Sequence, residues 1–378
     1  MASINRSRSS YTDPKMAIVL GAYLSHERIE QAKSGKRPRI DVVELSLKLG
    51  IPLYGFDWLE QCVKRDRLTG RLMKVYRNQS DLLALRAFSA LQNTDVVYAT
   101  GEDVGLPLAM LLLLKRKKRP ILIMRLEQPT YGRTPLRRWI YKAYFRLAMK
   151  RINLMMCRTQ AHVKLLRSWG ASEKQLSFVP ETTDSAFFNP ESQKESLESF
   201  KLPSQPYIVS AGLEMRDYDT LIEAVDGLPL HIVIGAGSPW SKFRYDRPDE
   251  SLPENVTVSS YTPPQMRELY RLAELVVVPV IPTLRACGMN VVLEAWAMQK
   301  PVIASRTAGL ASYIDDGQTG LFVEPRNAEA LRGKISYALS HPEEARVWGL
   351  NGWQRINTEL NLDRYLNEIT TAADSLMD

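Results

Sequence analysis

The stretch LVVVPVIPTLRACGMNVVLEAWAMQKPVIASRTAGLASYIDDGQTGLFV, residues 275–323, contains the pattern that decides the fold. Short apolar runs rich in valine and isoleucine alternate in it with a segment of helical periodicity. In chain order these are a strand, a helix and two strands, at Leu275–Val280, Asn290–Met298, Val302–Ala304 and Gly320–Val323. Such alternation is typical of parallel strands that are buried on both faces.

The same alternation extends over the whole chain of 378 residues, for example from Ala17–Leu20 in the first half to Tyr207–Ala211 in the second. Repeated βα units predict an α/β fold, here two Rossmann-like domains that face a cleft. A Ser-, Glu- and Pro-rich segment between them indicates a linker. We therefore expect a disordered tail (1–14), a first domain (15–182), a linker (183–206), a second domain (207–359) and a C-terminal helix (360–378) that packs back on one of the two domains.

The composition excludes several classes of protein. Three distant cysteines, Cys62, Cys157 and Cys287, do not suggest a disulfide framework and fit a reducing cytosol. The four histidines share no helical turn, so we expect no metal site. No apolar run approaches the roughly 20 residues that a membrane-spanning helix needs. The first fifteen residues lack the apolar stretch of a signal peptide. We expect a cytoplasmic protein.

Charge is distributed unevenly along the chain. The net charge is +8, but residues 1–180 contain 33 Lys and Arg against 14 Asp and Glu, a net charge of +19. The remaining residues contain 17 against 28, a net charge of −11. The basic half predicts an anionic partner: phospholipid, nucleic acid or a phosphorylated acceptor.

One basic segment, residues 134–151, mixes six Lys and Arg side chains with four aromatic ones. It is expected to form a helix that Thr134 and Pro135 begin. This composition is typical of an interfacial helix on an anionic membrane surface, with the protein peripheral on the inner face of the membrane. The alternative is an ordinary surface helix whose aromatic side chains pack on a sheet.

The loop before the helix at 290–298 has the features of an anion site. Gly288 allows the backbone to approach a ligand closely, and the amides of Gly288, Met289 and Asn290 begin a helix. Glu294 lies about one turn further and can accept hydrogen bonds from ribose hydroxyls.

At this point the sequence resembles the retaining family-4 glycosyltransferases of the GT-B fold. The resemblance rests on GMNVVLEAWAMQKPVIAS (288–305), AGLASYIDDGQTGLFVEP (308–325) and YIVSAGLEMRDYDTLIEA (207–224), and covers most of residues 205–340. It implies that the second domain binds a nucleotide sugar as co-substrate, with no further cofactor, and that Glu294 binds the ribose. It assigns the diphosphate to Cys287, Gly288, Met289, Asn290 and Val291.

Two positions depart from the pattern of that family. Ala286 stands where the resemblance implies the first of two glutamates, which marks a divergent branch. Gly212-Leu213 replaces a Gly-Arg…Lys-Gly signature, so Arg216 is the expected catalytic cation and diphosphate ligand, since a guanidinium grips phosphate oxygens and offsets the leaving charge. The alternative for Arg216 is a solvated side chain at a helix start.

Two further residues of the second half have competing interpretations. Tyr261 follows a strand, where it can stack on the nucleotide base or simply belong to a surface turn. Asp217-Tyr218-Asp219 has the spacing of a metal clasp, but Asp217 at the start of a helix is more simply an N-cap.

The first half supplies the expected acceptor side. Gly21 and Ala22 end the first strand, where a glycine suits close approach to the sugar, and a polar loop at 23–39 is expected to follow. Glu102 and Glu127 follow two later strands. Glu127 is the expected base or acceptor-orienting group, and its alternative is an ion pair with Arg125 or Arg133.

The leading hypothesis is therefore a retaining, metal-independent glycosyltransferase. It would transfer a sugar from a nucleotide diphosphate to a glycan or lipid acceptor, with a membrane lipid or lipid-linked glycan favoured over a soluble acceptor or polysaccharide. The alternative, suggested by Ala286, is a non-catalytic nucleotide-sugar-binding subunit. Nucleic-acid binding is not expected, because the second half is acidic and contains no reader motif.

Overall fold

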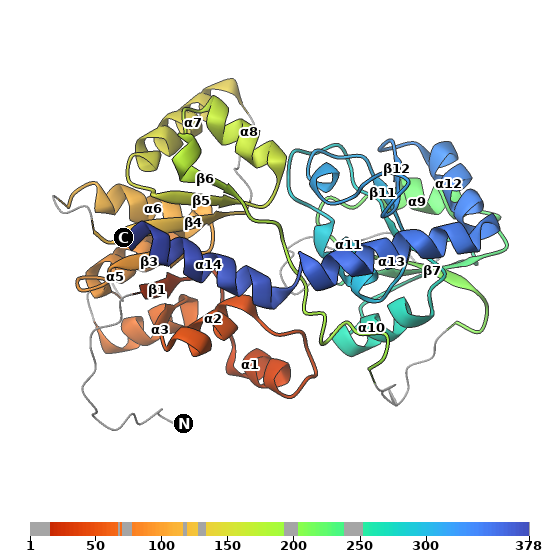
Figure 1. Ribbon diagram of the computed structural model, residues 1–378, viewed down its shortest axis with the longest axis horizontal. Helices are drawn as coiled ribbons and strands as arrows, with labels where there is room; N and C mark the ends of the chain where they lie inside the picture. Colours follow the sequence, from red (N-terminus) through yellow and green to blue (C-terminus); the bar gives the residue numbers. More distant parts are fainter. Residues whose placement is uncertain are drawn as a thin grey trace.

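The computed structural model describes residues 16–66, 69, 78–115, 119–127, 134–192, 203–237 and 252–377 (Figure 1). The expected tail at 1–14 and residues 193–202 of the expected linker lie outside these ranges, as does Arg133. The described chain forms two lobes, each built on a six-stranded parallel sheet with helices on its faces. The predicted α/β fold of two Rossmann-like units is confirmed.

The first lobe contains a sheet of strand order β2-β1-β3-β4-β5-β6. Its four inner strands are largely buried apolar runs that pair with a strand on each side; Ile18, for example, is paired with Leu53 and with Tyr98. The strands are β1 (Met16–Val19), β2 (Leu53–Tyr54), β3 (Val96–Ala99), β4 (Ile121–Leu126), β5 (Leu154–Cys157) and β6 (Leu176–Phe178). The helices are α1 (His26–Lys33), α2 (Asp41–Leu49), α3 (Phe56–Arg65), α5 (Gln79–Ala90), α6 (Glu102–Leu112), α7 (Pro135–Met149) and α8 (Gln160–Ser168), followed by the 3₁₀ turn η1 (Glu173–Gln175).

The second lobe contains a sheet of strand order β12-β11-β10-β7-β8-β9. Its strands are β7 (Tyr207–Ala211), β8 (His231–Gly235), β9 (Val256–Ser259), β10 (Val276–Val278), β11 (Val302–Ser305) and β12 (Leu321–Val323). The helices are α9 (Tyr218–Val225), α10 (Pro263–Leu272), α11 (Met289–Ala297), α12 (Ala328–Ser340) and α13 (Pro342–Thr358), with the 3₁₀ turn η3 (Leu310–Ser312). None of the described helices in either lobe is both long and apolar enough to span a bilayer.

The order of the strands determines where a ligand can bind. In each sheet the order in which successive strands are added changes direction at one point, which lies between β1 and β3 in the first lobe and between β7 and β10 in the second. In open parallel sheets the loops at the carboxyl ends of such neighbouring strands diverge and leave a crevice. The segments that follow these four strands, at 20–22, 100–103, 212–216 and 279–288, all contribute to one cleft.

The last helix, α14 (Leu362–Met377), packs on the first lobe although α13 before it covers the second (Figure 1). Its apolar face, with Tyr365, Leu366 and Ile369, belongs to the same buried cluster as Ile18 and Tyr98. The hydroxyls of Tyr98 and Tyr365 lie 2.7 Å apart. The chain therefore crosses between the lobes twice.

The expectation of a polar loop over residues 23–39 is wrong for residues 26–33, which form α1. This helix has no buried residue, so it lacks the apolar stripe that identifies a helix in a sequence. It is stabilised locally instead: the Ser25 hydroxyl accepts from the Arg28 amide, and Lys33 pairs with Glu30 at 2.9 Å.

Candidate functional site

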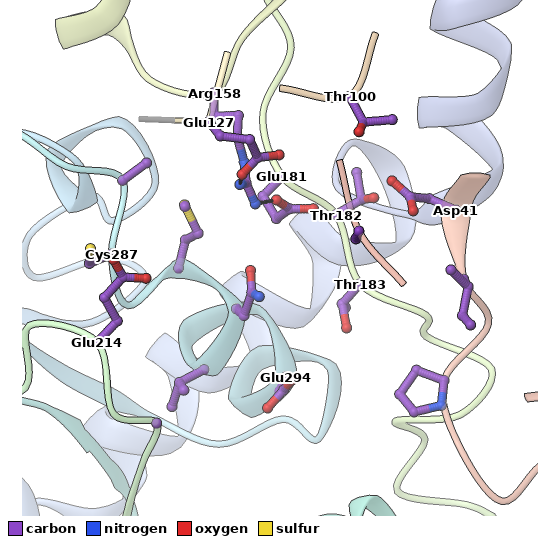
Figure 2. A pocket seen from close by; sticks show the side chains of 18 of the residues that line it. Asp41, Thr100, Glu127, Arg158, Glu181, Thr182, Thr183, Glu214, Cys287 and Glu294 are labelled. Carbon is purple, nitrogen blue, oxygen red and sulfur yellow. Dashed lines mark hydrogen bonds and ion pairs between the residues drawn. The ribbon is translucent and has the colours of Figure 1, made fainter. Parts of the chain in front are cut away.

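A cleft of about 1590 Å³ lies between the two lobes (Figure 2). Every site residue expected from the sequence lines it, from Gly21, Ala22, Glu102 and Glu127 in the first lobe to Gly212, Arg216, Tyr261, Cys287, Gly288, Met289, Asn290, Val291 and Glu294 in the second. The two halves of the predicted site therefore face one another across the same space.

The centre of the second-lobe wall is the start of α11. Gly288 is its N-cap and has φ +94°, a left-handed conformation that favours glycine. A Cβ atom at this position would lie 2.9 Å from Cγ1 of Val278, so close packing also requires glycine. The first amides of any helix have no partner within it, and they carry its positive dipole end. The cleft is therefore bordered by a ready anion-binding group.

Glu294 projects from α11 to the wall of the same cleft (Figure 2). Burial raises the pKa of its carboxyl group to about 7, against the opposing effects of a hydrogen bond from the Tyr270 hydroxyl and the charge of Arg216. The Tyr270 oxygen lies 3.0 Å from Oε2. A desolvated carboxylate at a cleft wall is a strong acceptor for ligand hydroxyls.

Arg216 is held in place, so the solvated alternative does not describe it. Its Nε donates to the carbonyl of Ala211 at 2.7 Å and its Nη1 to the carbonyl of Glu214 at 2.9 Å. The guanidinium lies against Gly212, where a Cβ atom would come within 2.5 Å of Nη2. The next residue, Asp217, caps α9 by accepting from the Thr220 amide, as predicted for it.

Tyr261 and Cys287 complete the second-lobe wall. Tyr261 is partly buried, packs against the core of the second lobe and borders the cleft. Cys287 is buried, and burial raises the pKa of its thiol to about 11. At neutral pH it is a protonated thiol and not a nucleophile. No three His, Cys, Asp or Glu side chains come together to hold a metal ion within the described ranges.

The reason for a glycine at position 21 differs from the one expected. A Cβ atom there would collide with the carboxylate of Asp103, so the glycine makes room for this side chain at the wall of the cleft. Gly101 has the same function, since its Cβ would lie 2.7 Å from Oδ1 of Asp103. Ala22 borders the cleft next to them, and its carbonyl accepts from the Phe56 amide at 3.2 Å.

Asp103 is thus the first-lobe group that the sequence interpretation missed. It is accessible from the cleft and accepts a hydrogen bond from the Ser80 hydroxyl at 3.0 Å. Desolvation raises the pKa of its carboxyl group. The available signal was a carboxylate two residues after Gly101, at the end of a strand beside the first one.

Glu127 forms the predicted ion pair with Arg125, at 2.9 Å, and a second one with Arg158 (Figure 2). Burial alone would raise the pKa of Glu127, but the two guanidinium groups outweigh it and lower the pKa. A carboxylate held in this way is a weak proton acceptor, so we assign it no proton transfer. Glu102 is buried, and its carboxylate accepts from the Glu127 amide at 3.1 Å.

The same charged groups lie where the two lobes meet, and hydrogen bonds from Tyr313 connect them to the second lobe. Glu181, in the segment that leaves the first lobe, pairs with Arg125 at 2.8 Å and also with Arg158. The hydroxyl of Tyr313, from the second lobe, accepts from the Glu181 amide and donates to the Arg158 carbonyl, each at 2.8 Å. Glu127 is therefore part of a charged cluster that fixes the base of the cleft.

Comparison with known proteins agrees with this geometry. Residues 191–355 match the family described as "Glycosyl transferases group 1". A D-inositol 3-phosphate glycosyltransferase of Nocardiopsis dassonvillei is 26% identical over 250 residues, which are 57% of this chain and 56% of that protein. A GDP-mannose-dependent alpha-(1-6)-phosphatidylinositol monomannoside mannosyltransferase of Mycolicibacterium smegmatis is 24% identical over 203 residues, 47% of this chain and 53% of that protein.

Similarity over the whole length comes from solved structures. The alpha,alpha-trehalose 6-phosphate synthase of Burkholderia multivorans aligns with a TM-score of 0.71 at 14% identity, over 96% of this chain and 99% of that one. The chain therefore has the GT-B fold, and its second lobe is similar to the group 1 glycosyltransferases. It spans little more than half the length of the curated relatives it matches.

Proposed function

We propose that the protein transfers a sugar from a nucleotide diphosphate to an acceptor held by the first lobe. The observation that carries the proposal is the start of α11, which borders the same cleft as the Arg216 guanidinium and the Glu294 carboxylate. Helix amides and a guanidinium bind the diphosphate and stabilise its charge as it leaves, while the carboxylate binds the ribose hydroxyls. Tyr261 stacks on the base. No metal ion takes part in this proposal.

On the acceptor side, the proposal gives Asp103 the role that was expected of Glu127. Its carboxylate is accessible in the cleft, and its raised pKa favours hydrogen bonding to a neutral hydroxyl group. Transfer occurs with retention, on the same face of the sugar as the departing diphosphate. The donor phosphate then accepts the proton of the acceptor, so a second base is not required.

A lipid or lipid-linked acceptor is favoured by α7. Its Tyr141 and Tyr144 border the cleft, whereas Leu136, Trp139 and Ile140 are exposed on the outside, Trp139 by 68%. One face of this helix thus packs on the lobe, as the alternative interpretation expected, and the other presents the apolar side chains that a membrane contact would use. The exposed apolar side chains lie next to the cations Arg137 and Arg138. An apolar face with adjacent cations fits the surface of an anionic membrane beside the acceptor site.

The donor side is tested by thermal shift with UDP, GDP and ADP and their sugars. One nucleoside diphosphate is expected to raise the unfolding temperature, because a ligand that binds only the native state stabilises it. No shift with any of them would refute the proposal. Arg216→Ala should abolish the shift, and the matched control Arg346→Ala, on the exposed side of α13, should preserve it.

Transfer is tested by incubating the protein with the stabilising nucleotide sugar and extracted membrane lipids. A radiolabelled lipid product whose anomeric configuration equals that of the donor, measured by NMR, is the expected result. Binding without product or donor hydrolysis would instead identify the protein as a non-catalytic nucleotide-sugar-binding subunit.

Membrane contact is tested by sedimentation with vesicles of phosphatidylglycerol and phosphatidylcholine at low salt. The double variant Arg137→Glu/Arg138→Glu is expected to lose at least most of the bound fraction. The control variant Lys334→Glu/Arg346→Glu changes the net charge by the same amount as the test variant, but on α12 and α13, and should bind vesicles like the unmodified protein. Equal loss in both variants would show that only net charge matters.

A further inference from the structure

The loop between β7 and α9 places a carboxylate that the proposed function does not use. Glu214 lies between Gly212 and Arg216, and its side chain borders the cleft with 39% of its surface exposed. Nη1 of Arg285, from the loop that leads to α11, lies 2.8 Å from its Oε1. Figure 2 shows Glu214 beside Cys287 at the cleft wall. We infer that Glu214, positioned by Arg285, binds a hydroxyl group of the transferred sugar.

The direction of the donor along α11 supports this inference, which rests on the proposed function. Glu294 lies five residues after Met289, so its Cα is about 7.5 Å further along the helix axis. The sugar is attached to the phosphate that is farther from the ribose, so with the diphosphate at the helix start and the ribose at Glu294 we place the sugar on the side of the diphosphate away from Glu294. Figure 2 shows Glu214 and Cys287 on that other side of the first turn of α11.

The second-lobe wall of the cleft contains few charged groups that can accept hydrogen bonds from the hydroxyls of a sugar. Among the described residues of the second lobe, Glu214 and Glu294 are the two carboxylates that border the cleft. A carboxylate offers two oxygens with about four lone-pair sites, so a bond to one guanidinium does not exhaust its capacity to accept. Sugar hydroxyls are donors that need such acceptors. The neighbouring Ala286 contributes only a methyl group to the same wall.

The backbone of Arg285 is itself fixed, which gives its side chain a firm support as a positioning residue. Its amide donates to Oγ1 of Thr283 at 3.0 Å, and its carbonyl accepts from the Cys287 amide at 3.0 Å. A Cβ atom at Gly309 would lie 2.6 Å from the same carbonyl, so the adjacent loop packs directly against it. A hydrogen-bonding group on such a support costs little further ordering when a ligand arrives.

The test compares two affinities in the full-length protein by isothermal titration calorimetry: that for the nucleoside diphosphate found in the thermal-shift panel and that for its nucleotide sugar. Glu214→Ala should weaken binding of the nucleotide sugar about tenfold. It should leave the affinity for the nucleoside diphosphate unchanged or higher, because a negative charge near the diphosphate is removed. Glu214→Gln, which keeps the shape of the side chain, should also weaken binding of the nucleotide sugar relative to the nucleoside diphosphate, but by a smaller factor.

Two further variants separate sugar recognition from structure. Arg285→Ala should reduce the same preference for the sugar, since it releases the carboxylate, whereas Glu343→Gln on exposed α13 should change neither affinity. Equal weakening of both ligands by Glu214→Ala, or no change in either, would overturn the inference. Absence of any nucleotide binding in the unmodified protein would refute the proposed function itself, and the inference with it.

Discussion

Replacing Glu294 by glutamine should stabilise the protein while weakening its binding of nucleotide. The pKa of this carboxyl group is raised from 4.5 to about 7, so the folded protein holds a proton that the unfolded chain releases. Stability therefore falls as pH rises from 4.5 through 7. The difference of about 2.5 pKa units corresponds to about 3 kcal/mol at pH 8. Glutamine is neutral at every pH and does not incur this loss.

The assay is urea unfolding of both proteins at several pH values between 4.5 and 8. The free energies of unfolding should be similar at pH 4.5, and that of Glu294→Gln should exceed the other by about 3 kcal/mol at pH 8. Nucleoside diphosphate binding at pH 8 should weaken at least tenfold, since a hydrogen bond to a charged group contributes about 1.5–3 kcal/mol.

Tyr270→Phe provides an independent check. The tyrosine hydroxyl stabilises the ionised form of Glu294, so its removal should raise the pKa further and increase the loss of stability above pH 7. Glu343→Gln serves as the control with no pH-dependent difference. If the free energies of unfolding of Glu294→Gln and of the unmodified protein differ by the same amount at every pH, the carboxylate is not desolvated. If nucleotide affinity is unchanged, it does not bind the ribose.

Three further predictions concern other parts of the cleft. Gly288→Ala should lower the free energy of unfolding by about 1–3 kcal/mol, because alanine is strained at φ +94° and contacts Val278, and it should abolish the nucleotide-induced thermal shift. The control Gly333→Ala, which has open space around it in α12, should stabilise the protein by about 0.5–1 kcal/mol. An unchanged melting temperature of Gly288→Ala would contradict the assigned geometry. Asp103→Asn should reduce kcat about 100-fold with nucleotide affinity unchanged, because the acceptor hydroxyl is no longer oriented, and a kcat within twofold would remove Asp103 from the acceptor site. Burial, and after it the charge of Arg158, lowers the pKa of the His162 imidazole to about 4. Between pH 6.5 and 4 the unfolded chain therefore binds a proton that the folded protein does not, and up to about 3 kcal/mol of stability is lost on acidification. His162→Gln should lose less stability between pH 7 and 4.5 in urea unfolding, and an equal loss in both proteins would refute a neutral buried imidazole.

The placement of the α11 residues at the cleft could be predicted because they are close in the sequence. Gly288 and Glu294 lie on one helix and its cap, so a single local pattern contains both the anion site and the carboxylate. The fold could be predicted for a related reason: parallel strands buried on both faces appear as continuous apolar runs, such as Val276–Val278.

The first-lobe part depends on contacts between distant segments, which no local pattern contains. Gly21 was expected to border the cleft, but the side chain it makes room for, Asp103, is 82 residues away. Glu127 was expected to be a base or acceptor-orienting group, with an ion pair to a sequence neighbour as the alternative, and the structure pairs it also with Arg158 from the next strand end. The helix α1 was missed because its stability comes from capping and ion pairing and not from an apolar face.

The position of α14 has a consequence for how this protein can be divided. Because residues 362–377 cover an apolar surface of the first lobe, a fragment that ends at the linker would lack part of its own interior. Shortening the C-terminus would therefore damage the half of the molecule that contains the N-terminus. An independently folding first lobe requires α14 to be joined to it through a new connection, whereas affinity tags at the C-terminus should follow Asp378 by a flexible spacer.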